Sequence, residues 1–301
     1  MELFGGIEAG GTKCICIVGS DPNHIQTEKR IPTTSPGETI QNIVEFFKPY
    51  SGSGGLNAVG IATFGPVDLN HNSPTYGYIT TTPKPGWRQV DLYGEIQRGL
   101  NIPVAFDTDV NAAAFGEQYW SNGKQKLDPF LYMTVGTGIG VGVIVNGAPL
   151  HGLIHAEAGH FMLPHNLEKD PFQGVCPYHG DCLEGLASGK SMAKRWGQSP
   201  ETLPDDHPAW DLEAHYIALA LVNLIYAYSP RRIILGGGVP QHLGLIQMAR
   251  VKVREIINGY VQSEEVEQKI EEYIQSPYLG NRSGALGAMA MASQLSEKTD
   301  I

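Results

Sequence analysis

The stretch FGGIEAGGTKCICIVGSD, residues 4–21, decides the fold of this chain. Apolar side chains alternate on both sides of a glycine-rich turn, which is the pattern of a β-strand, a tight turn and a returning strand. The stretch FLYMTVGTGIGVGVIVNG, residues 130–147, repeats that pattern about 126 positions later. The recurrence predicts two similar domains, each opening with a β-hairpin.

Strand and helix patterns alternate around the two hairpins. Apolar residues at positions 40, 43, 44 and 47 recur at helical spacing, and AVGIATFG (58–65) and PVAFD (103–107) are typical of strands. TDVNAAAFGEQYW (108–120) predicts a helix with Asp109 near its N-cap. Later in the chain we expect a long buried helix at 209–228, a strand ending in glycines at 231–238 and a helix from 281 after a glycine turn. This alternation predicts an α/β fold with mixed sheets and a domain boundary near Asp109.

Composition excludes several classes of protein. The 301 residues carry a net charge of -10, from 21 basic and 31 acidic residues, and no basic cluster of the kind that binds nucleic acid. The N-terminus MELFGGIEAGG lacks the basic start of a signal peptide. The longest apolar run, IALALVNLIYAY, is too short for a membrane span. We therefore expect a cytoplasmic protein that binds neither membranes nor nucleic acid, and that needs a local device to hold an anionic substrate.

Glycine-rich loops are candidates for that device. EAGGTK, residues 8–13, is not a Walker A loop, because GxxxxGK[ST] is absent from the chain. A glycine-rich hairpin turn can still aim backbone amides at a phosphate, with Thr12 adding a hydroxyl and Lys13 a charge. Taken alone, the motif is better explained as a tight turn that simply needs glycine. TVGTGIG (134–140), LGGGVP (235–240) and GNRSG (280–284) recur in the same chain, and together they favour a nucleotide.

Two carboxylates in FDTDVNAAAFGE stand at the end of a strand and the start of a helix. Asp107 and Asp109 are two residues apart, so in a strand they would face one pocket. A carboxylate there could accept a proton from a substrate hydroxyl, as the general base of phosphoryl transfer does. Asp109 could instead cap the helix, or do both.

The stretch CPYHGDC, residues 176–182, indicates a metal site. With an upstream histidine it gives His160, Cys176, His179 and Cys182, a closed tetrahedral set of the kind that holds structural zinc. The upstream place is also open to His151, His155 and His165. A redox site is disfavoured since the chain has no CxxC, and a chance cluster stays open. Cys14 and Cys16 are interpreted as small core residues.

These motifs, in this order, resemble the ROK family of sugar kinases over essentially the whole chain. EAGGTK resembles the first phosphate hairpin of the family, FGPVD (64–68) its sugar loop, DTDVNAAAFGE its catalytic segment and TVGTGIG its second phosphate hairpin. HAEAGH (155–160) followed by CPYHGDCLEG resembles its sugar-binding and zinc signature. The TTTPKPGW loop (80–87) and CPYHGDCLEGLASG look most like the bacterial fructokinase branch.

The resemblance implies two actin-like, ribonuclease-H-like α/β domains with the hexokinase/ROK architecture, which close around ATP and a hexose in an interdomain cleft. We expect a smaller domain from residues 1–112 and 282–301 and a larger one from 113–281 with the zinc site. The implied activity is ATP-dependent phosphorylation of D-fructose to fructose 6-phosphate by a homodimer, with Mg²⁺ and a structural Zn²⁺.

The resemblance also assigns residues. Asp109 becomes the general base on the 6-hydroxyl. The sugar would contact Gly65, Thr108, Glu157, His160 and Glu184. ATP and its metal would lie on Glu8, Gly10, Gly11, Thr12, Lys13, Thr134, Gly136, Thr137, Gly138, Gly236, Gly237 and Gly238. Zinc would be held by His160, Cys176, His179 and Cys182, so that His160 serves both metal and sugar.

Two positions depart from the family pattern. Glu8 stands where the first hairpin usually has Asp, which puts the geometry around Mg²⁺ in question. Thr108 stands where glucose-specific members usually have Asn, which argues against a glucose kinase. Two kinds of alternative stay open: a ROK kinase of another hexose (mannose, glucose or N-acetylmannosamine), and a non-catalytic sugar-binding protein. A sugar-sensing repressor would need an N-terminal helix-turn-helix, which we do not expect here.

Overall fold

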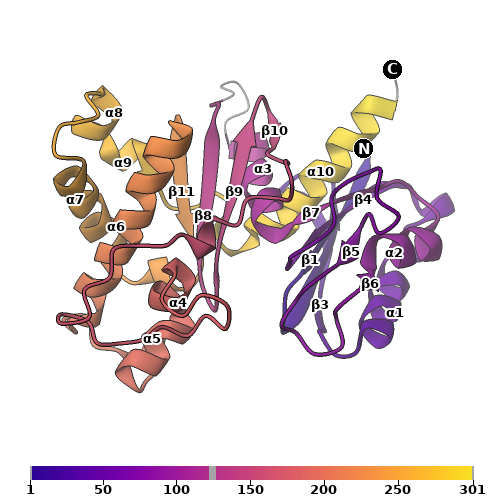
Figure 1. Ribbon diagram of the computed structural model, residues 1–301. Coiled ribbons are helices and arrows are strands. Elements are labelled where there is room, and N and C mark those ends of the chain that lie inside the picture. The colour runs from indigo at the N-terminus through magenta and orange to yellow at the C-terminus, as the bar shows by residue number, and fades with distance from the viewer. Residues whose placement is uncertain (1, 122–126, 300–301) are drawn as a thin grey trace. The chain divides into compact units, whose positions relative to one another are not determined.

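The computed structural model describes residues 2–121 and 127–299 of the chain. The chain divides into two compact units (Figure 1). The first comprises Met1–Lys126, Gly147–Ala156 and Tyr278–Ile301, and the second Leu127–Asn146 and Glu157–Pro277. Both units are mixed α/β structures, as the alternation of strand and helix patterns predicts.

The first unit is built on a five-stranded sheet of order β3-β2-β1-β4-β7. Its strands are β1 (Leu3–Ala9), β2 (Lys13–Gly19), β3 (Ile25–Pro32), β4 (Leu56–Thr63) and β7 (Val104–Thr108). The antiparallel β1–β2 pair is the predicted hairpin, whereas β4 pairs with both β1 and β7 in parallel. The carboxyl ends of β1, β4 and β7 therefore lie at one edge of the sheet.

Helices cover both faces of this sheet. They are α1 (Pro36–Phe47), α2 (Leu92–Leu100), α3 (Asp109–Ser121) and α10 (Ser283–Thr299). The unit also contains the 3₁₀ turns η1 (Gly52–Gly54) and η5 (Gly280–Arg282) and the short strands β5 (Tyr78–Ile79) and β6 (Val90–Asp91). Cys14 and Cys16 share a core with residues of α1 and α2. Ile15 and Ile17, which alternate with them, pack with α10 on the other face. The two cysteines are thus confirmed as small core residues.

The helix α10 lies unusually close to the sheet because glycines face it. A Cβ atom on Gly60 would overlap the carbonyl oxygen of Ala288, and one on Gly6 would overlap that of Ala285. Gly287 approaches the backbone of Ala112 in α3 in the same way. Any larger residue at these positions would push α10 off the sheet.

The second unit contains the predicted hairpin β8 (Phe130–Val135) and β9 (Ile139–Val145), with β8 parallel to β11 (Arg232–Gly236) and β11 parallel to β12 (Ile274–Gln275). Its helices are α4 (Leu183–Ala187), α5 (Gly189–Trp196), α6 (Ala209–Tyr228), α7 (Leu245–Ile257), α8 (Glu264–Glu267) and α9 (Ile270–Tyr273). The unit also has three short 3₁₀ turns, η2 (Ala158–His160), η3 (Pro200–Thr202) and η4 (Val239–Gln241). The short strand β10 (Ala148–Pro149) follows β9 in the chain. The long buried helix expected at 209–228 is α6, confirmed residue for residue.

The division between the units follows packing. The boundary expected at residues 112–113 falls inside α3, and the structure keeps that whole helix in the first unit, where it packs on α10. Residues 147–156 also return to the first unit. Residues 1, 300 and 301 of the expected ranges lie outside the described residues. Among residues 2–121 and 127–299, none of the helices has the length and apolar character of a bilayer span.

Candidate active site and metal centre

Two carboxylates of the first unit stand at the sheet edge where the parallel strands end. Glu8 is near the end of β1, and its Oε2 accepts a hydrogen bond from the amide of Ala285, 3.1 Å away, in the first turn of α10. Asp109 is the first residue of α3, and its Oδ1 accepts from the amide of Val110 at 2.9 Å. Both carboxylates therefore lie where helix N-termini favour negative charge.

The surroundings raise the pKa values of both carboxylates toward neutral pH. Burial, together with the charge of Asp109, raises the pKa of Glu8 to about 7, although the Ala285 amide and Lys13 act in the opposite direction. Burial also raises the pKa of Asp109 to about 6. A carboxylate with such a pKa is an effective general base near pH 7, because it is ionised and still has a useful affinity for a proton.

The raised pKa of Glu8 predicts how stability varies with pH. The folded state holds the Glu8 proton more tightly than the unfolded state, so its contribution to stability is present below pH 4.5 and is lost as pH rises to about 7. We expect Glu8→Gln to gain on the order of 2 kcal/mol relative to the wild type between those limits. Thermal melts from pH 4.5 to 8, with exposed Glu2→Gln as the control, measure this gain. Parallel curves for Glu8→Gln and wild type would contradict it.

The hydroxyl of Thr108 caps α3, so the capping role that the sequence left open for Asp109 belongs to its neighbour. Thr108 Oγ1 accepts a hydrogen bond from the amide of Asn111 at 3.2 Å, the contact that an N-cap residue makes three positions on. A hydroxyl that accepts this bond can still donate its own proton to a ligand. The cap at Thr108 leaves the Asp109 carboxylate available for chemistry.

Asp107 is held by its neighbours. Its Oδ1 accepts from the amide of Thr108 and from Asn111 Nδ2, both at 2.7 Å, and its Oδ2 lies 2.8 Å from His151 Nε2. This hydrogen bond raises the pKa of His151. The strand alternation expected to place Asp107 and Asp109 in one pocket fails, because Asp109 already lies in α3.

The FGPVD loop follows β4 and is supported by residues that the sequence did not single out for it. The amide of Val67 donates to His155 Nε2 at 3.2 Å, and a Cβ atom on Gly65 would lie 3.5 Å from the same nitrogen. Burial lowers the pKa of His155, which favours the neutral, accepting ring. On the other side, the amide and hydroxyl of Thr80 both donate to the carbonyl of Pro66, at 2.8 and 3.0 Å. The backbone around Gly65 is thereby fixed.

The first glycine-rich turn connects β1 to β2. The amide of Gly10 donates to the carbonyl of Lys13 at 3.0 Å, and the carbonyl of Thr12 accepts from the amide of Thr33 at 3.0 Å. A side chain on Gly11 would meet open space. The turn therefore has one side anchored in the protein and one side accessible to a ligand.

The second turn connects β8 to β9 in the second unit. The amide of Gly136 donates to the carbonyl of Gly138 at 2.9 Å, and Thr137 between them is exposed. Glu184 of α4 supports this turn, since its Oε2 accepts from the amide of Ile139 at 3.0 Å and would lie 2.6 Å from a Cβ atom on Gly138. Thr134, also expected to contact nucleotide, is half-buried in β8. Glu184, expected beside the sugar, is thus also a neighbour of the expected phosphate turn.

The three glycines of LGGGVP differ from one another. A Cβ atom on Gly236 would overlap the hydroxyl of Tyr132, and Gly237, with φ of +96°, lies against the backbone of Val135. Packing on the neighbouring strand explains both glycines. A side chain on Gly238 would meet open space, which leaves Gly238 as the best placed of the three to face a nucleotide.

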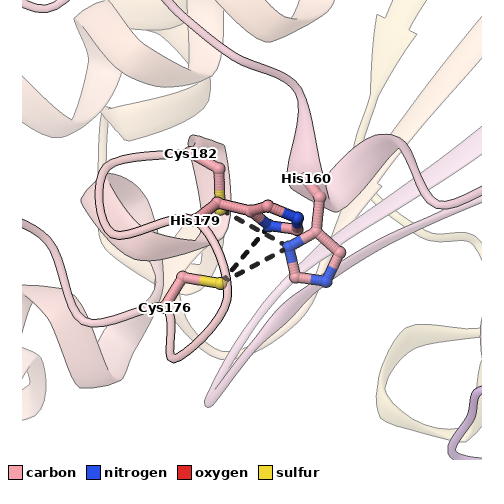
Figure 2. A group of neighbouring side chains, drawn as sticks. All are labelled: His160, Cys176, His179 and Cys182. Carbon is pink, nitrogen blue, oxygen red and sulfur yellow. Dashed lines mark hydrogen bonds between the residues drawn. The ribbon is translucent and has the colours of Figure 1, made fainter. Parts of the chain in front are cut away.

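The four predicted zinc ligands lie together in the second unit (Figure 2). One ligand atom from each of His160, Cys176, His179 and Cys182 lies within 4.8 Å of the others. His160 Nδ1 is 3.4 Å from Cys182 Sγ and 3.8 Å from Cys176 Sγ, and His179 Nδ1 is 3.6 Å from Cys176 Sγ. A tetrahedral zinc with usual bond lengths places nitrogen and sulfur ligands about 3.6 Å apart. The donor set fits structural zinc in both chemistry and spacing.

The orientation of His160 leaves one ring nitrogen outside the cluster. Its Nδ1 faces both cysteine sulfurs, and Figure 2 shows the other nitrogen turned away from them. Glu157 is the exposed N-cap of η2, and its carbonyl accepts from the amide of His160 at 3.0 Å. His160 can therefore ligate a metal through Nδ1 and contact a ligand through Nε2.

The other three candidate histidines have different partners. His151 pairs with Asp107, His155 accepts from Val67, and His165 Nδ1 lies 3.0 Å from Asp181 Oδ2. Asp181 stands between two of the candidate ligands in the chain, so His165 supports the metal loop from outside. Of the four histidines weighed for the upstream place, His160 alone joins the cluster found among residues 2–121 and 127–299.

Comparison with known proteins places these features in context. The family profile described as "ROK family" matches residues 4–295. The fructokinase of Pediococcus pentosaceus is 43% identical over 96% of this chain and 97% of its own length, and that of Streptococcus mutans is 41% identical over 99% of each. The crystal structure of ROK hexokinase from Thermus thermophilus aligns with a TM-score of 0.76 at 24% identity, covering 98% of this chain and 99% of that one. The predicted two-domain, actin-like sugar-kinase fold is thereby confirmed.

Proposed function

The chain belongs to the ROK family and is a fructokinase, and we propose that it transfers the γ-phosphoryl group of ATP to the 6-hydroxyl of D-fructose with Asp109 as general base. The placement of Asp109 carries this proposal. It begins α3 at the carboxyl edge of the parallel strands, its helix is capped by Thr108, and its pKa is raised to about 6. Ligands of open α/β sheets bind at that edge.

The proposed step moves one proton and one phosphoryl group. The Asp109 carboxylate accepts the proton of the 6-hydroxyl while that oxygen forms a bond to the γ-phosphorus. The bond from the γ-phosphorus to the bridging oxygen breaks, and ADP leaves with the electron pair. A well-placed base contributes roughly 10²- to 10⁴-fold, and positioning and electrostatics supply most of the remaining acceleration.

The phosphates need positive partners in a chain of net charge -10. In the proposal, the two glycine-rich turns supply these partners as backbone amides, hydroxyls and one ammonium. The residues are Gly10, Gly11, Thr12 and Lys13 of the first unit and Gly136, Thr137 and Gly138 of the second. Thr134, Gly236, Gly237 and Gly238 complete the expected nucleotide contacts, with Gly238 the most open. A Mg²⁺ ion would neutralise phosphate oxygens. Glu8, whose pKa is raised in part by the charge of Asp109, would be a suitable oxygen ligand for this ion.

The sugar would be held by the backbone at Gly65, by Thr108, Glu157 and Glu184, and by His160 through Nε2. A zinc ion held by Nδ1 of His160 would fix the tautomer and ring direction that this contact requires. The metal is thus proposed as a structural support of the sugar site. We also propose a cytoplasmic homodimer, because four free cysteines suit a reducing compartment and the family resemblance implies a dimer.

Turnover with a panel of sugars tests the proposal. We expect ADP production from ATP and Mg²⁺ to have its highest kcat/KM with fructose, compared with mannose, glucose and N-acetylmannosamine. Thr108, in place of the Asn of glucose-specific members, is the feature that disfavours glucose. Highest kcat/KM with another hexose would contradict fructose while keeping the reaction. No turnover, together with sugar binding but no nucleotide binding in a titration, would favour the non-catalytic alternative.

A further inference from the structure

Lys84, from the TTTPKPGW loop, reaches the first glycine-rich turn across 73 positions of sequence. Its Nζ donates to the carbonyl of Gly11 and, at 3.4 Å, to that of Thr33. Two carbonyl oxygens directed at one point repel each other, and an ammonium between them removes that repulsion. Lys84 thus fixes the anchored side of the turn.

The loop around Lys84 is itself held in place. The amide of Lys84 donates to Thr82 Oγ1 at 3.3 Å, and its carbonyl accepts from the amide of Trp87 at 3.2 Å. Trp87 is fully buried and donates through Nε1 to the carbonyl of Thr34 at 2.9 Å. Because these contacts already order the loop, Lys84 loses less conformational entropy when it reaches the turn.

The hydrogen bond to Gly11 determines where the next amide points. The carbonyl of Gly11 and the amide of Thr12 belong to one planar trans peptide, so they face opposite ways. With Lys84 on the Gly11 carbonyl, the Thr12 amide points away from Lys84, in a turn where a side chain on Gly11 would meet open space. Within residues 2–121 and 127–299, the amides of Gly11 and Thr12 have no acceptor in the structure. Consecutive unpaired amides of this kind form an anion-binding concavity.

We propose that Lys84 is a positioning residue for phosphoryl transfer, which directs the Thr12 amide toward the phosphates of ATP by holding the Gly11 carbonyl. The proposal rests on the proposed role of residues 10–13 as a phosphate site. The same loop begins with Thr80, which holds the Pro66 carbonyl of the sugar loop. One segment, residues 80–87, therefore braces the sugar loop at one end and the phosphate turn at the other.

Steady-state kinetics of Lys84→Met test the proposal. We expect the KM for ATP to rise about 10-fold or more, the effect of losing a hydrogen bond to a charged group, while the KM for fructose stays within about twofold. Lys84→Arg should recover part of the ATP affinity, because a guanidinium can also donate to two carbonyls. Lys48→Met, at an exposed lysine after α1, is the matched control and should behave as wild type.

An ATP KM within twofold of wild type in Lys84→Met would overturn the proposal, as would equal rises for ATP and fructose, which indicate general loosening. If Lys84→Met does not fold by circular dichroism, Lys84→Gln is measured against the same criteria. Gly11→Val separates the two proposals, since its side chain enters open space beside the turn. If the KM for ATP is unchanged in Gly11→Val, the proposed phosphate turn itself is contradicted. If the KM for ATP rises in Gly11→Val but not in Lys84→Met, only the role of Lys84 is contradicted.

Discussion

The Asp109→Asn variant is expected to lose fructose phosphorylation by about 10²- to 10⁴-fold while it still binds fructose and ATP. The amide has nearly the size of the carboxylate and can accept the hydrogen bond from the Val110 amide, but it cannot accept the substrate proton. The helix should remain intact, because Thr108 supplies its cap. Turnover assays and calorimetric titrations with each substrate measure the two properties separately.

Asp21→Asn is a suitable control for this variant. Asp21 lies in the exposed turn after β2 and bonds locally to His24, so its replacement should leave kcat unchanged. A kcat close to that of the wild type in Asp109→Asn would contradict the assignment of Asp109 as the general base. Loss of fructose binding in parallel with kcat would instead point to a binding role.

The second large effect is expected from the loss of zinc. Purified protein should contain close to one zinc per chain, and Cys182→Ser should remove most of it. Structural zinc contributes on the order of 10 kcal/mol to small zinc domains at pH 7, so a marked fall in thermal stability is expected. The KM for fructose should also rise, because His160 loses the metal that orients its ring.

Cys16→Ala provides the matched control for Cys182→Ser. Cys16 is equally buried but lies in the core of the first unit, so this variant should keep its zinc and its KM for fructose. Metal analysis and thermal melts with and without a chelator compare the two variants. Wild-type protein without near-stoichiometric zinc, and with no loss of stability under chelation, would contradict the metal centre.

Features set by local spacing could be read from the sequence. The hairpins at the first and second turns follow from alternation over a few residues on each side of a glycine-rich turn. The donor set of Cys176, His179 and Cys182 follows from three-residue steps along one short loop. In each case the residues that interact are close in the chain, so periodicity and spacing are sufficient.

Contacts between distant segments were missed for the opposite reason. Lys84 is 73 residues from Gly11, and His155 is 88 residues from Val67. No local pattern distinguishes a histidine that supports a loop from one that binds a metal, so the sequence indicates His155 only as a candidate zinc ligand. Thr108 and Asp109 are adjacent, and both residue types are good helix caps. Which of the two is the cap depends only on the residue at which α3 begins.

The packing of α10 on the first sheet bears on how the chain is made. Leu286 and Met289 of α10 complete the core around Phe4 and Ile17, so the first strands to leave the ribosome wait for one of the last helices. At usual translation speeds, roughly ten to forty seconds separate the synthesis of α3 from that of α10. The nascent sheet must stay free of aggregation during that interval. Gly6 and Gly60 help, because they reduce the apolar surface that this face, which also carries Phe4 and Ile17, exposes to other nascent proteins before α10 covers it.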